Sequence, residues 1–294
     1  MAEQDVVETL TPVSTGNGPS VAVAFGGGGA RGIAHIHIIE ALDELGIRPV
    51  AISGASIGAI MGAGMASGMR GADIRNHVVS TFGNRTEVMA RLWKLRPTKV
   101  SELFSNGFRL GQFDVVKVLN AFLPDGVARR FEDLAIPLHV SATDYYGQHE
   151  TVLKSGDLYS AIGASAAIPA LFRPVRRDGR IYIDGGIINP VPFDNIAGLA
   201  EIIAGIDVVG GPEGDHDRMP SAIETMFGAT QLVMQSVTAW KVRVNHPEIL
   251  IRPPVARFRV MDFLKSGEVL AATAGIKEDF KRALDAAFER HAAR

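Results

Sequence analysis

Ser53-Gly54-Ala55-Ser56-Ile57-Gly58 follows the apolar residues Val50-Ala51-Ile52 and precedes a run of small and apolar residues from Ala59 to Met69. This order predicts a short strand that turns sharply into a helix, with glycines on both sides of Ser56 because a side chain there would clash. A serine held at such a corner can act as a nucleophile. We therefore predict that Ser56 is a nucleophile, against the alternative of a serine in an ordinary tight connection.

The residues before this turn predict another strand and a glycine-rich loop. Val21-Ala22-Val23-Ala24-Phe25 is an apolar run, typical of a parallel strand that is buried on both faces. Glycines 26–29 follow, and a helical pattern then runs over residues 33–45 until Gly46, which is expected to end the helix. With a strand over residues 49–53, this βαβα order implies a parallel sheet with a right-handed crossover.

The rest of the chain adds short strands and longer helices. Strands are expected at 137–143, 148–153, 175–177, 180–183, 202–208 and 249–251, and helices at 158–167, 223–244 and 268–290. Residues 1–19 are expected to be a flexible lead-in, and residues 20–294 one α/β domain with a C-terminal helical region from about 221. Residues 74–123 are basic and aromatic, and are expected to form a mainly helical insertion or cap over the sheet edge.

Composition excludes several classes of function. The chain has 294 residues and a formal net charge of -2, which gives no electrostatic footprint for nucleic acid. It has no cysteine, so disulfides, thiolate catalysis and thiolate metal sites are excluded. Its first residues show no secretory signal, and its longest apolar run is shorter than the ~20 residues of a membrane-spanning helix. We expect a cytoplasmic protein.

The glycine loop has two interpretations. Gly27-Gly28-Gly29-Ala30-Arg31-Gly32 matches the dinucleotide-binding pattern G-x-G-x-x-G, which requires an acidic residue at the end of the second strand. That strand ends instead in Ser53-Gly54-Ala55-Ser56, and the nearby acidic residues fall on the intervening helix. Alternatively, the N–H groups of Gly27, Gly28 and Gly29, with that of Ile57, stabilise an oxyanion.

A serine nucleophile also needs a base. Asp184-Gly185-Gly186 follows a predicted strand, and Asn189-Pro190-Val191-Pro192 then forms a rigid turn, so Asp184 can act directly if burial raises its pKa. A Ser-His-Asp esterase or thioesterase remains the alternative, with candidate histidines at His139, His149, His216, His246 and His291. His35 and His37 lie on different faces of a helix and are expected to pack or face solvent, so no metal or other cofactor is predicted.

Three motifs occur in order: Phe25-Gly-Gly-Gly-Gly-Ala-Arg-Gly32, Gly54-Ala-Ser-Ile-Gly58 and Asp184-Gly-Gly186. With them the chain resembles the bacterial patatin-like phospholipases from about residue 21 to 209. The likeness includes Ala34-His35-Ile36, Ala164-Ser165-Ala166-Ala167-Ile168-Pro169 and Asn189-Pro190-Val191-Pro192.

The resemblance implies a three-layer α/β/α fold with a mainly parallel sheet, and a lipid acyl hydrolase of phospholipase A, lysophospholipase or carboxylesterase type. By position it implies that Ser56 is the nucleophile, Asp184 the base without a histidine, and Gly27, Gly28, Gly29 and Ile57 the oxyanion hole. Arg31 would order the glycine loop. The supporting glycines would be Gly32, Gly54, Gly58, Gly185 and Gly186, and His37, where the family often has glycine, would affect packing alone.

The expected partner is a lipid or another acyl ester, with peripheral membrane contact through the basic and aromatic segment from Arg85 to Phe113, which contains Trp93. A solvated helical cap with a packed underside is the alternative for that segment. A catalytically weak protein that acts through a binding partner is a further alternative.

Overall fold

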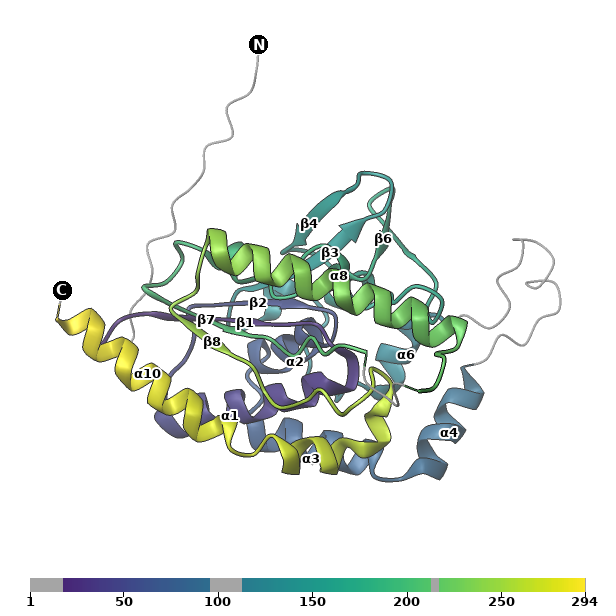
Figure 1. Ribbon diagram of the computed structural model, residues 1–294, viewed down its shortest axis with the longest axis horizontal. Coiled ribbons are helices and arrows are strands. Elements are labelled where there is room, and N and C mark those ends of the chain that lie inside the picture. Colours follow the sequence, from purple (N-terminus) through teal and green to yellow (C-terminus); the bar gives the residue numbers. More distant parts are fainter. Residues whose placement is uncertain (1–17, 96–112, 213–216, 294) are drawn as a thin grey trace, which may run out of the picture.

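The computed structural model describes residues 18–95, 113–212 and 217–293 (Figure 1). Most of the predicted lead-in, residues 96–112 of the predicted cap, and His216 lie outside these residues. The described strands are β1 (Val21–Phe25), β2 (Ala51–Ala55), β3 (Leu138–Asp144), β4 (His149–Leu153), β5 (Val175–Arg177), β6 (Arg180–Ile183), β7 (Ile202–Ile206) and β8 (Ile249–Ile251). They form one sheet.

The centre of this sheet is parallel and carries two of the site motifs. The spatial order is β5-β6-β3-β2-β1-β7-β8, with β4 also paired to β3. Strands β3, β2, β1, β7 and β8 run parallel, whereas β4, β5 and β6 pair antiparallel at one edge. Phe25 stands opposite Gly54 in the β1–β2 register, so the loops after these strands leave the same carboxyl edge, where α/β folds bind ligands.

Helices occupy most of the remaining described chain. The α-helices are α1 (His35–Leu45), α2 (Ile57–Ala66), α3 (Gly71–Phe82), α4 (Arg85–Lys94), α6 (Val115–Phe122), α7 (Leu158–Ser165), α8 (Ala222–Val244), α9 (Ser266–Ala272) and α10 (Ile276–Ala292). Short 3₁₀ helices are η1 (Gly29–Ala34), η2 (Phe131–Asp133), η3 (Gly185–Ile187), η4 (Phe193–Ile196) and η5 (Asp262–Lys265).

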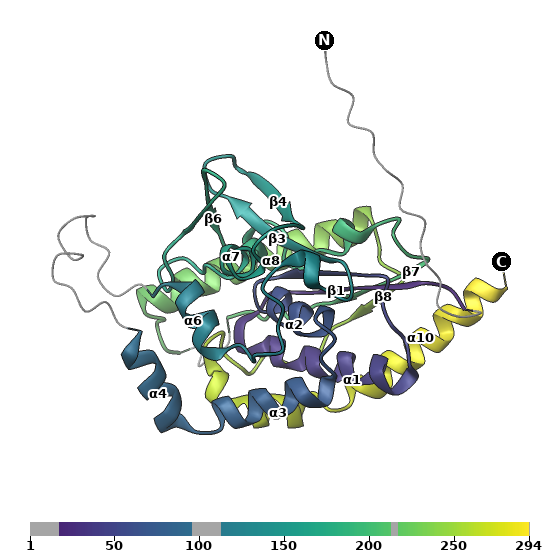
Figure 2. The same ribbon diagram turned by 180° about the vertical axis from the view of Figure 1, so that it is seen from behind.

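The two faces of the sheet are covered differently because β1 alternates large and small side chains. Val21, Val23 and Phe25 point into the larger apolar core, to which α1, α2 and α10 contribute. Ala22 and Ala24 face a smaller core, where their size lets η4 pack closely and where Val242 of α8 also packs. Helix α8 crosses this side, and α1, α3 and α10 lie on the other (Figures 1 and 2). The predicted three-layer α/β/α fold is confirmed.

The main errors of the sequence-based prediction concern boundaries. Strand β2 continues to Ala55, directly before Ser56, and Gly46 ends α1 in the left-handed conformation as expected. The helix predicted at 268–290 is two helices, α9 and α10. They part between Thr273 and Gly275, residue types of low helix propensity, and Thr273 there is buried.

The described parts of the predicted cap are helical, as expected, but they pack mainly on other helices and not on a sheet edge. Helix α3 packs against α1 and α9, and α6 packs against α7. The apolar faces of α3 and α6 thereby become part of the larger core, through Ile74, Val78, Val115 and Leu119.

Candidate active site

Ser56 occupies the corner between β2 and α2. Its backbone has φ 54° and ψ -123°, a conformation that non-glycine residues rarely adopt and that occurs at functional turns. The Ser56 N–H donates to Ser165 Oγ at 2.8 Å, and both residues are buried. The backbone strain is therefore held in place by a buried polar contact from α7.

The turn depends on close approach between α2 and β1. A Cβ atom at Gly58 would collide with the carbonyl oxygen of Phe25, the last residue of β1. Gly54 and Gly185 are similarly crowded by the backbones of Ala59 and Ser141, and Gly32 by the side chain of Ile57. These positions exclude side chains because neighbouring elements fill the space, whereas Gly186 meets the flexible end of Met234.

Asp184 follows β6 and meets Ser56 across the carboxyl edge of the sheet. Ser56 Oγ donates to Asp184 Oδ2 at 2.6 Å, and the Gly186 N–H donates to Oδ1 at 2.8 Å. Thr143 of β3 fixes the backbone there, since its Oγ1 donates to the Asp184 carbonyl oxygen at 2.8 Å. Burial raises the pKa of Asp184 to about 6, although the hydrogen bonds from Ser56 and Gly186 favour the charged form.

The glycine loop lies on the other side of Ser56, and one of its predicted oxyanion donors is already engaged. The Gly27 N–H donates to the Pro190 carbonyl oxygen at 2.8 Å and is not available to an oxyanion. The prediction that Gly27 is an oxyanion donor is therefore corrected. Within the described parts of the chain, the N–H groups of Gly28, Gly29 and Ile57 make no hydrogen bond. Gly29 has φ +62°, and a Cβ there would collide with Val260.

Arg31 ties the glycine loop to two distant segments. Its side chain is buried, and its Nε donates to the Phe258 carbonyl oxygen at 2.6 Å. A second, longer hydrogen bond of 3.4 Å runs from Nη2 to the Gly211 carbonyl oxygen. The guanidinium thus fixes the glycine loop to the segments that contain Phe258 and Gly211, and backbone carbonyl oxygens accept its hydrogen bonds.

The described histidines form their hydrogen bonds and ion pairs with residues other than Ser56 and Asp184. Among the histidines that the structure describes, none has a hydrogen bond to Ser56 or Asp184. Their ring nitrogens meet other atoms: His35 meets Gly26 O, His37 meets Leu270 O, His77 meets Phe122 O, His139 meets Asn195 O, His149 meets Glu150 O, His246 meets Pro247 O, and His291 meets a Glu201 carboxylate. Burial also lowers the pKa of His35 to about 4, which keeps its ring neutral beneath the glycine loop.

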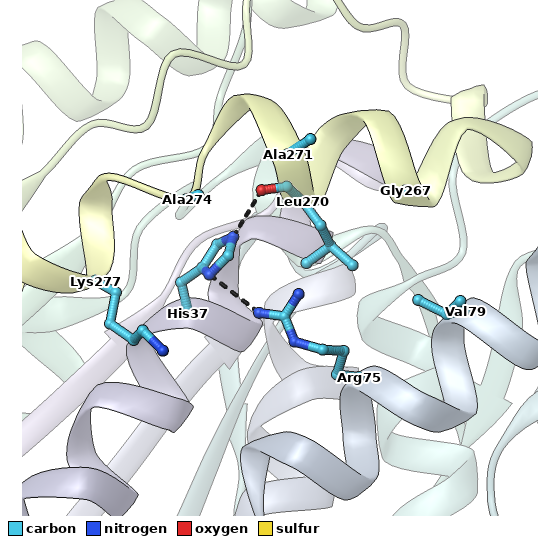
Figure 3. A pocket seen from close by; sticks show the side chains of 8 residues that line it. All are labelled: His37, Arg75, Val79, Gly267, Leu270, Ala271, Ala274 and Lys277. Atoms are coloured by element: carbon cyan, nitrogen blue, oxygen red, sulfur yellow. Dashed lines mark hydrogen bonds between the residues drawn. The ribbon is translucent and has the colours of Figure 1, made fainter.

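A cavity of ≈ 490 Å³ lies between α1, α3 and α9, and His37 is one of the residues that line it (Figure 3). Figure 3 shows His37 between the Leu270 carbonyl and the Arg75 guanidinium. Arg75 also forms two hydrogen bonds to Glu40, at 2.5 and 2.7 Å, and Lys277 binds Glu44 at 2.8 Å. Ser56 and Asp184 do not line this cavity, and its cations are already paired.

Comparison with known proteins identifies the family. A family model described as patatin-like phospholipase matches residues 23–196, more than half of the chain, and spans all three motifs. The chain belongs to the patatin-like phospholipase family. The match runs from within β1 to the end of η4, so it includes both Ser56 and Asp184.

Relatives within this family share the region to different extents. An uncharacterised NTE family protein of Mycobacterium tuberculosis is 35% identical over 197 residues, which cover 67% of this chain and 51% of that protein. Patatin-like phospholipase domain-containing protein 7 of Rattus norvegicus is 28% identical over 285 residues, 88% of this chain and 20% of that protein. The chain thus spans about half or less of these relatives.

Among solved structures, VipD from Legionella pneumophila is 15% identical with a TM-score of 0.48, and the match covers 90% of this chain and 67% of that one. Human GIVD cytosolic phospholipase A2 with methyl γ-linolenyl fluorophosphonate is 13% identical with a TM-score of 0.39, over 94% and 60% of the two chains.

An apolar cavity of ≈ 320 Å³ opens from Ser56 into the layer of helices. Its lining is carbon-rich and comes from α2, α3, α4, α6 and η5, for example Ile60, Phe82, Leu92, Leu119 and Phe263. A smaller space of ≈ 50 Å³ also borders Ser56, and its lining includes Asp184, Arg31 and Gln231. Ser56 therefore borders two spaces of different size, and both have mainly apolar linings.

Sequence reasoning missed two residues of this site. Ser165 and Thr143 hold the backbones of Ser56 and Asp184, respectively, through their hydroxyl groups. Ser165 lies in the Ala164–Pro169 stretch of the resemblance, which was the available signal for it. Thr143 ends a predicted strand like many other threonines, so no sequence feature marks it.

None of the described helices is both long and apolar enough to cross a bilayer.

Proposed function

We propose that this chain hydrolyses carboxylic ester bonds of lipids, with Ser56 as the nucleophile and Asp184 as the general base. The observation that carries the proposal is the 2.6 Å hydrogen bond from Ser56 Oγ to Asp184 Oδ2, formed between two buried side chains. A carboxylate with a pKa near 6 is largely ionised at neutral pH and can accept the serine proton directly. Family membership supports the same assignment.

In the first step, Ser56 Oγ attacks the ester carbonyl carbon while its proton passes to Asp184 Oδ2. The carbonyl oxygen becomes an oxyanion. We assign the N–H groups of Gly28, Gly29 and Ile57 as its donors, because they hydrogen-bond to no other acceptor in the described residues. Ile57 directly follows Ser56, and Gly29 lines the same cavity as Ser56.

In the second step the carbon–oxygen bond to the alcohol breaks, and Asp184 returns the proton to the departing oxygen. An acyl group then remains on Ser56. Water attacks this acyl carbon, gives its proton to Asp184 Oδ2, and releases a fatty acid when Ser56 Oγ leaves and recovers the proton. One water is consumed for each ester, and no proton is gained or lost by the site.

The acyl part of the substrate would occupy the apolar cavity, which Ser56 lines. Burial of an acyl chain is favourable by about 0.8 kcal/mol for each methylene group. This supports phospholipid or lysophospholipid substrates over small polar esters.

The two alternatives have less support. A histidine triad would need a histidine within hydrogen-bond reach of Ser56, and the described histidines are engaged elsewhere. A dinucleotide would need open space above the glycine loop, but Val208 and Val260 stand against Gly28 and Gly29, and β2 ends in Ala55 without an acidic residue.

The test is ester hydrolysis by the wild-type chain and by Ser56→Ala and Asp184→Asn. Substrates would be a water-soluble butyrate ester, a lysophospholipid and a diacyl phospholipid, with fatty acid release as the readout. We expect each substitution to reduce kcat by at least about a thousandfold, because removal of one member disables the pair. A fluorophosphonate should label wild-type Ser56 and leave Ser56→Ala unlabelled.

Asp178→Asn provides the matched control. Asp178 lies in the turn between β5 and β6, and its side chain is 83% exposed. We expect it to retain wild-type activity. A folded Asp184→Asn protein with normal turnover would refute the assigned base.

We also infer that lipid enters from a membrane surface at the mouth of the apolar cavity. Met89 of α4, Met261 and Leu264 line the cavity and are 49%, 49% and 43% exposed, so apolar surface continues from the cavity to the outside. Trp93 lies one helical turn after Met89 and is 67% exposed. Tryptophan is favoured at membrane–water interfaces.

A further inference from the structure

One face of α2 lines the apolar cavity from the nucleophile inward. The residues of this face are Ile57, Ile60, Met61 and Gly64, spaced as i, i+3, i+4 and i+7. Helix α2 begins immediately after Ser56, so position along the helix is also distance from the reacting carbon. No other cavity-lining helix starts at the nucleophile among the described elements.

Residue positions along α2 therefore measure depth in the cavity from Ser56. Gly64 comes eight residues after Ser56, which corresponds to about 12 Å along the helix axis at about 1.5 Å per residue. An extended acyl chain advances about 1.25 Å per carbon, because its bonds of about 1.5 Å form a staggered zigzag. Gly64 therefore stands beside about the tenth carbon of a chain whose carbonyl lies at Ser56.

The passage beside Gly64 is narrow at that depth. A Cβ atom on it would lie 3.2 Å from Ile74 Cδ1 and 3.9 Å from Met69 Sδ, and both of these residues also line the cavity. Any side chain at position 64 would project between Ile74 and Met69. Methionine is flexible and adapts to the shape of a neighbouring ligand, so Met69 can form a yielding wall.

We propose that Gly64, together with Met69 and Ile74 opposite it, determines the length of acyl chain that the site accepts. Chains of up to about ten carbons lie along α2 before this point, and a longer chain passes Gly64 when the flexible side chains of Met69 and Ile74 move aside. The inference rests on the proposed function, since it concerns the acyl group that Ser56 receives.

The test measures kcat/KM for one ester series with acyl chains from 4 to 18 carbons, under conditions in which each ester is monomeric or presented in the same detergent. For Gly64→Leu we expect values within about twofold of wild type up to 8 carbons, and a loss of more than tenfold from 14 carbons onward. Gly64→Ala adds one methyl group and should reduce the long-chain values by about fourfold.

Gly62→Ala is the matched control. It is the same change on the same helix, but its Cβ would face Ile52 and Leu138 of the sheet at 3.0 and 3.2 Å, and Gly62 does not line the cavity. Any loss of stability in this variant acts on all esters alike, so the ratio of long-chain to short-chain activity should equal that of the wild type.

Met69→Ala tests the opposite direction and does not depend on whether Gly64→Leu folds. Shortening Met69 enlarges the cavity beside Gly64 and should raise the ratio of long-chain to short-chain activity severalfold. An unchanged ratio in both Gly64→Ala and Met69→Ala would overturn the inference. Absence of butyrate ester hydrolysis by the wild type would instead count against the proposed function, so the two failures are distinguishable.

Discussion

At the scale of single residues, the site depends on a carboxylate, Asp184, whose burial disfavours its charged form. Asp184 is buried, and desolvation raises its pKa to about 6, above the 3.8 of an ordinary aspartate. A base of this strength can accept a proton at neutral pH and also return it to a leaving alcohol. The same desolvation makes the charged form costly to the folded state.

This cost predicts how Asp184→Asn changes stability. Below pH 3.8 Asp184 is protonated in both the folded and unfolded chains, so it adds no pH-dependent term. As the pH rises from 3.8 to 6, the unfolded chain releases the proton before the folded one, and the wild type loses stability. Above pH 6 the loss is complete, at about 2 to 3 kcal/mol.

We therefore expect the free energy of unfolding of Asp184→Asn to exceed that of the wild type at pH 8 and to approach it at pH 4. Urea denaturation across this range measures the difference. The asparagine oxygen can still accept the Gly186 N–H, which limits other changes. Asp178→Asn, with its exposed side chain, should show a small difference at every pH. A wild type more stable than Asp184→Asn at pH 8 would contradict the sign.

Residue types and their order were enough to single out Ser56, Asp184 and the glycine loop as candidates, because glycines flank each of them. The engagement of Gly27 was not predictable, since its partner is the carbonyl oxygen of Pro190, far away in the chain. A hydrogen bond between backbone groups that are far apart in the sequence cannot be inferred from the residue types alone. The same holds for Thr143 beneath Asp184.

At the scale of elements, α2 and β1 approach so closely that one glycine decides the packing. Glycine inside a helix ordinarily destabilises it by about 1 kcal/mol relative to alanine, so Gly→Ala is expected to stabilise a helix. At Gly58 the added methyl group would collide with the Phe25 carbonyl oxygen at the end of β1. Overpacking of this kind costs about 1 to 3 kcal/mol and outweighs the propensity gain.

We predict that Gly58→Ala lowers the free energy of unfolding, whereas Gly267→Ala raises it by about 0.5 to 1 kcal/mol. Gly267 lies in α9, and a Cβ there meets nothing within 4 Å, so only helix propensity acts. Urea denaturation of the two variants compares the same chemical change in two settings. Stabilisation by Gly58→Ala would show that α2 can move away from β1 at little cost.

The elements themselves followed from sequence where the pattern was strong. Apolar runs located β1 and β7, and Gly46 located the end of α1. The single helix predicted at 268–290 failed because its apolar spacing continues through Thr273 and Gly275, although the chain bends there. The spacing of apolar residues shows which face of a helix is buried, but it does not show whether the helix axis is continuous.

At the scale of the whole molecule, two exposed apolar surfaces compete as the place where the protein meets a membrane. One surrounds the cavity mouth and comprises Met89, Trp93, Met261 and Leu264. The other is a stripe on α8 formed by Ile223, Met226, Val233, Trp240 and Val244. Figure 1 shows α8 along the upper side of the sheet and α4 at the lower right end. The sequence indicated Trp93 as a membrane contact, but it did not show that Met261 and Leu264, from a distant segment, lie at the same cavity mouth.

The chain has two tryptophans, and each surface contains one of them, 67% exposed at Trp93 and 65% at Trp240. Trp240→Phe leaves Trp93 as the reporter of the cavity mouth, and Trp93→Phe leaves Trp240 as the reporter of α8. Because the lipid must reach Ser56 through the mouth, we expect phospholipid vesicles to shift the emission of Trp240→Phe to the blue and to protect it from a soluble quencher. The emission of Trp93→Phe should change little. The reverse result would place α8 against the bilayer, and no shift in either variant would mean that the protein takes its substrate from solution.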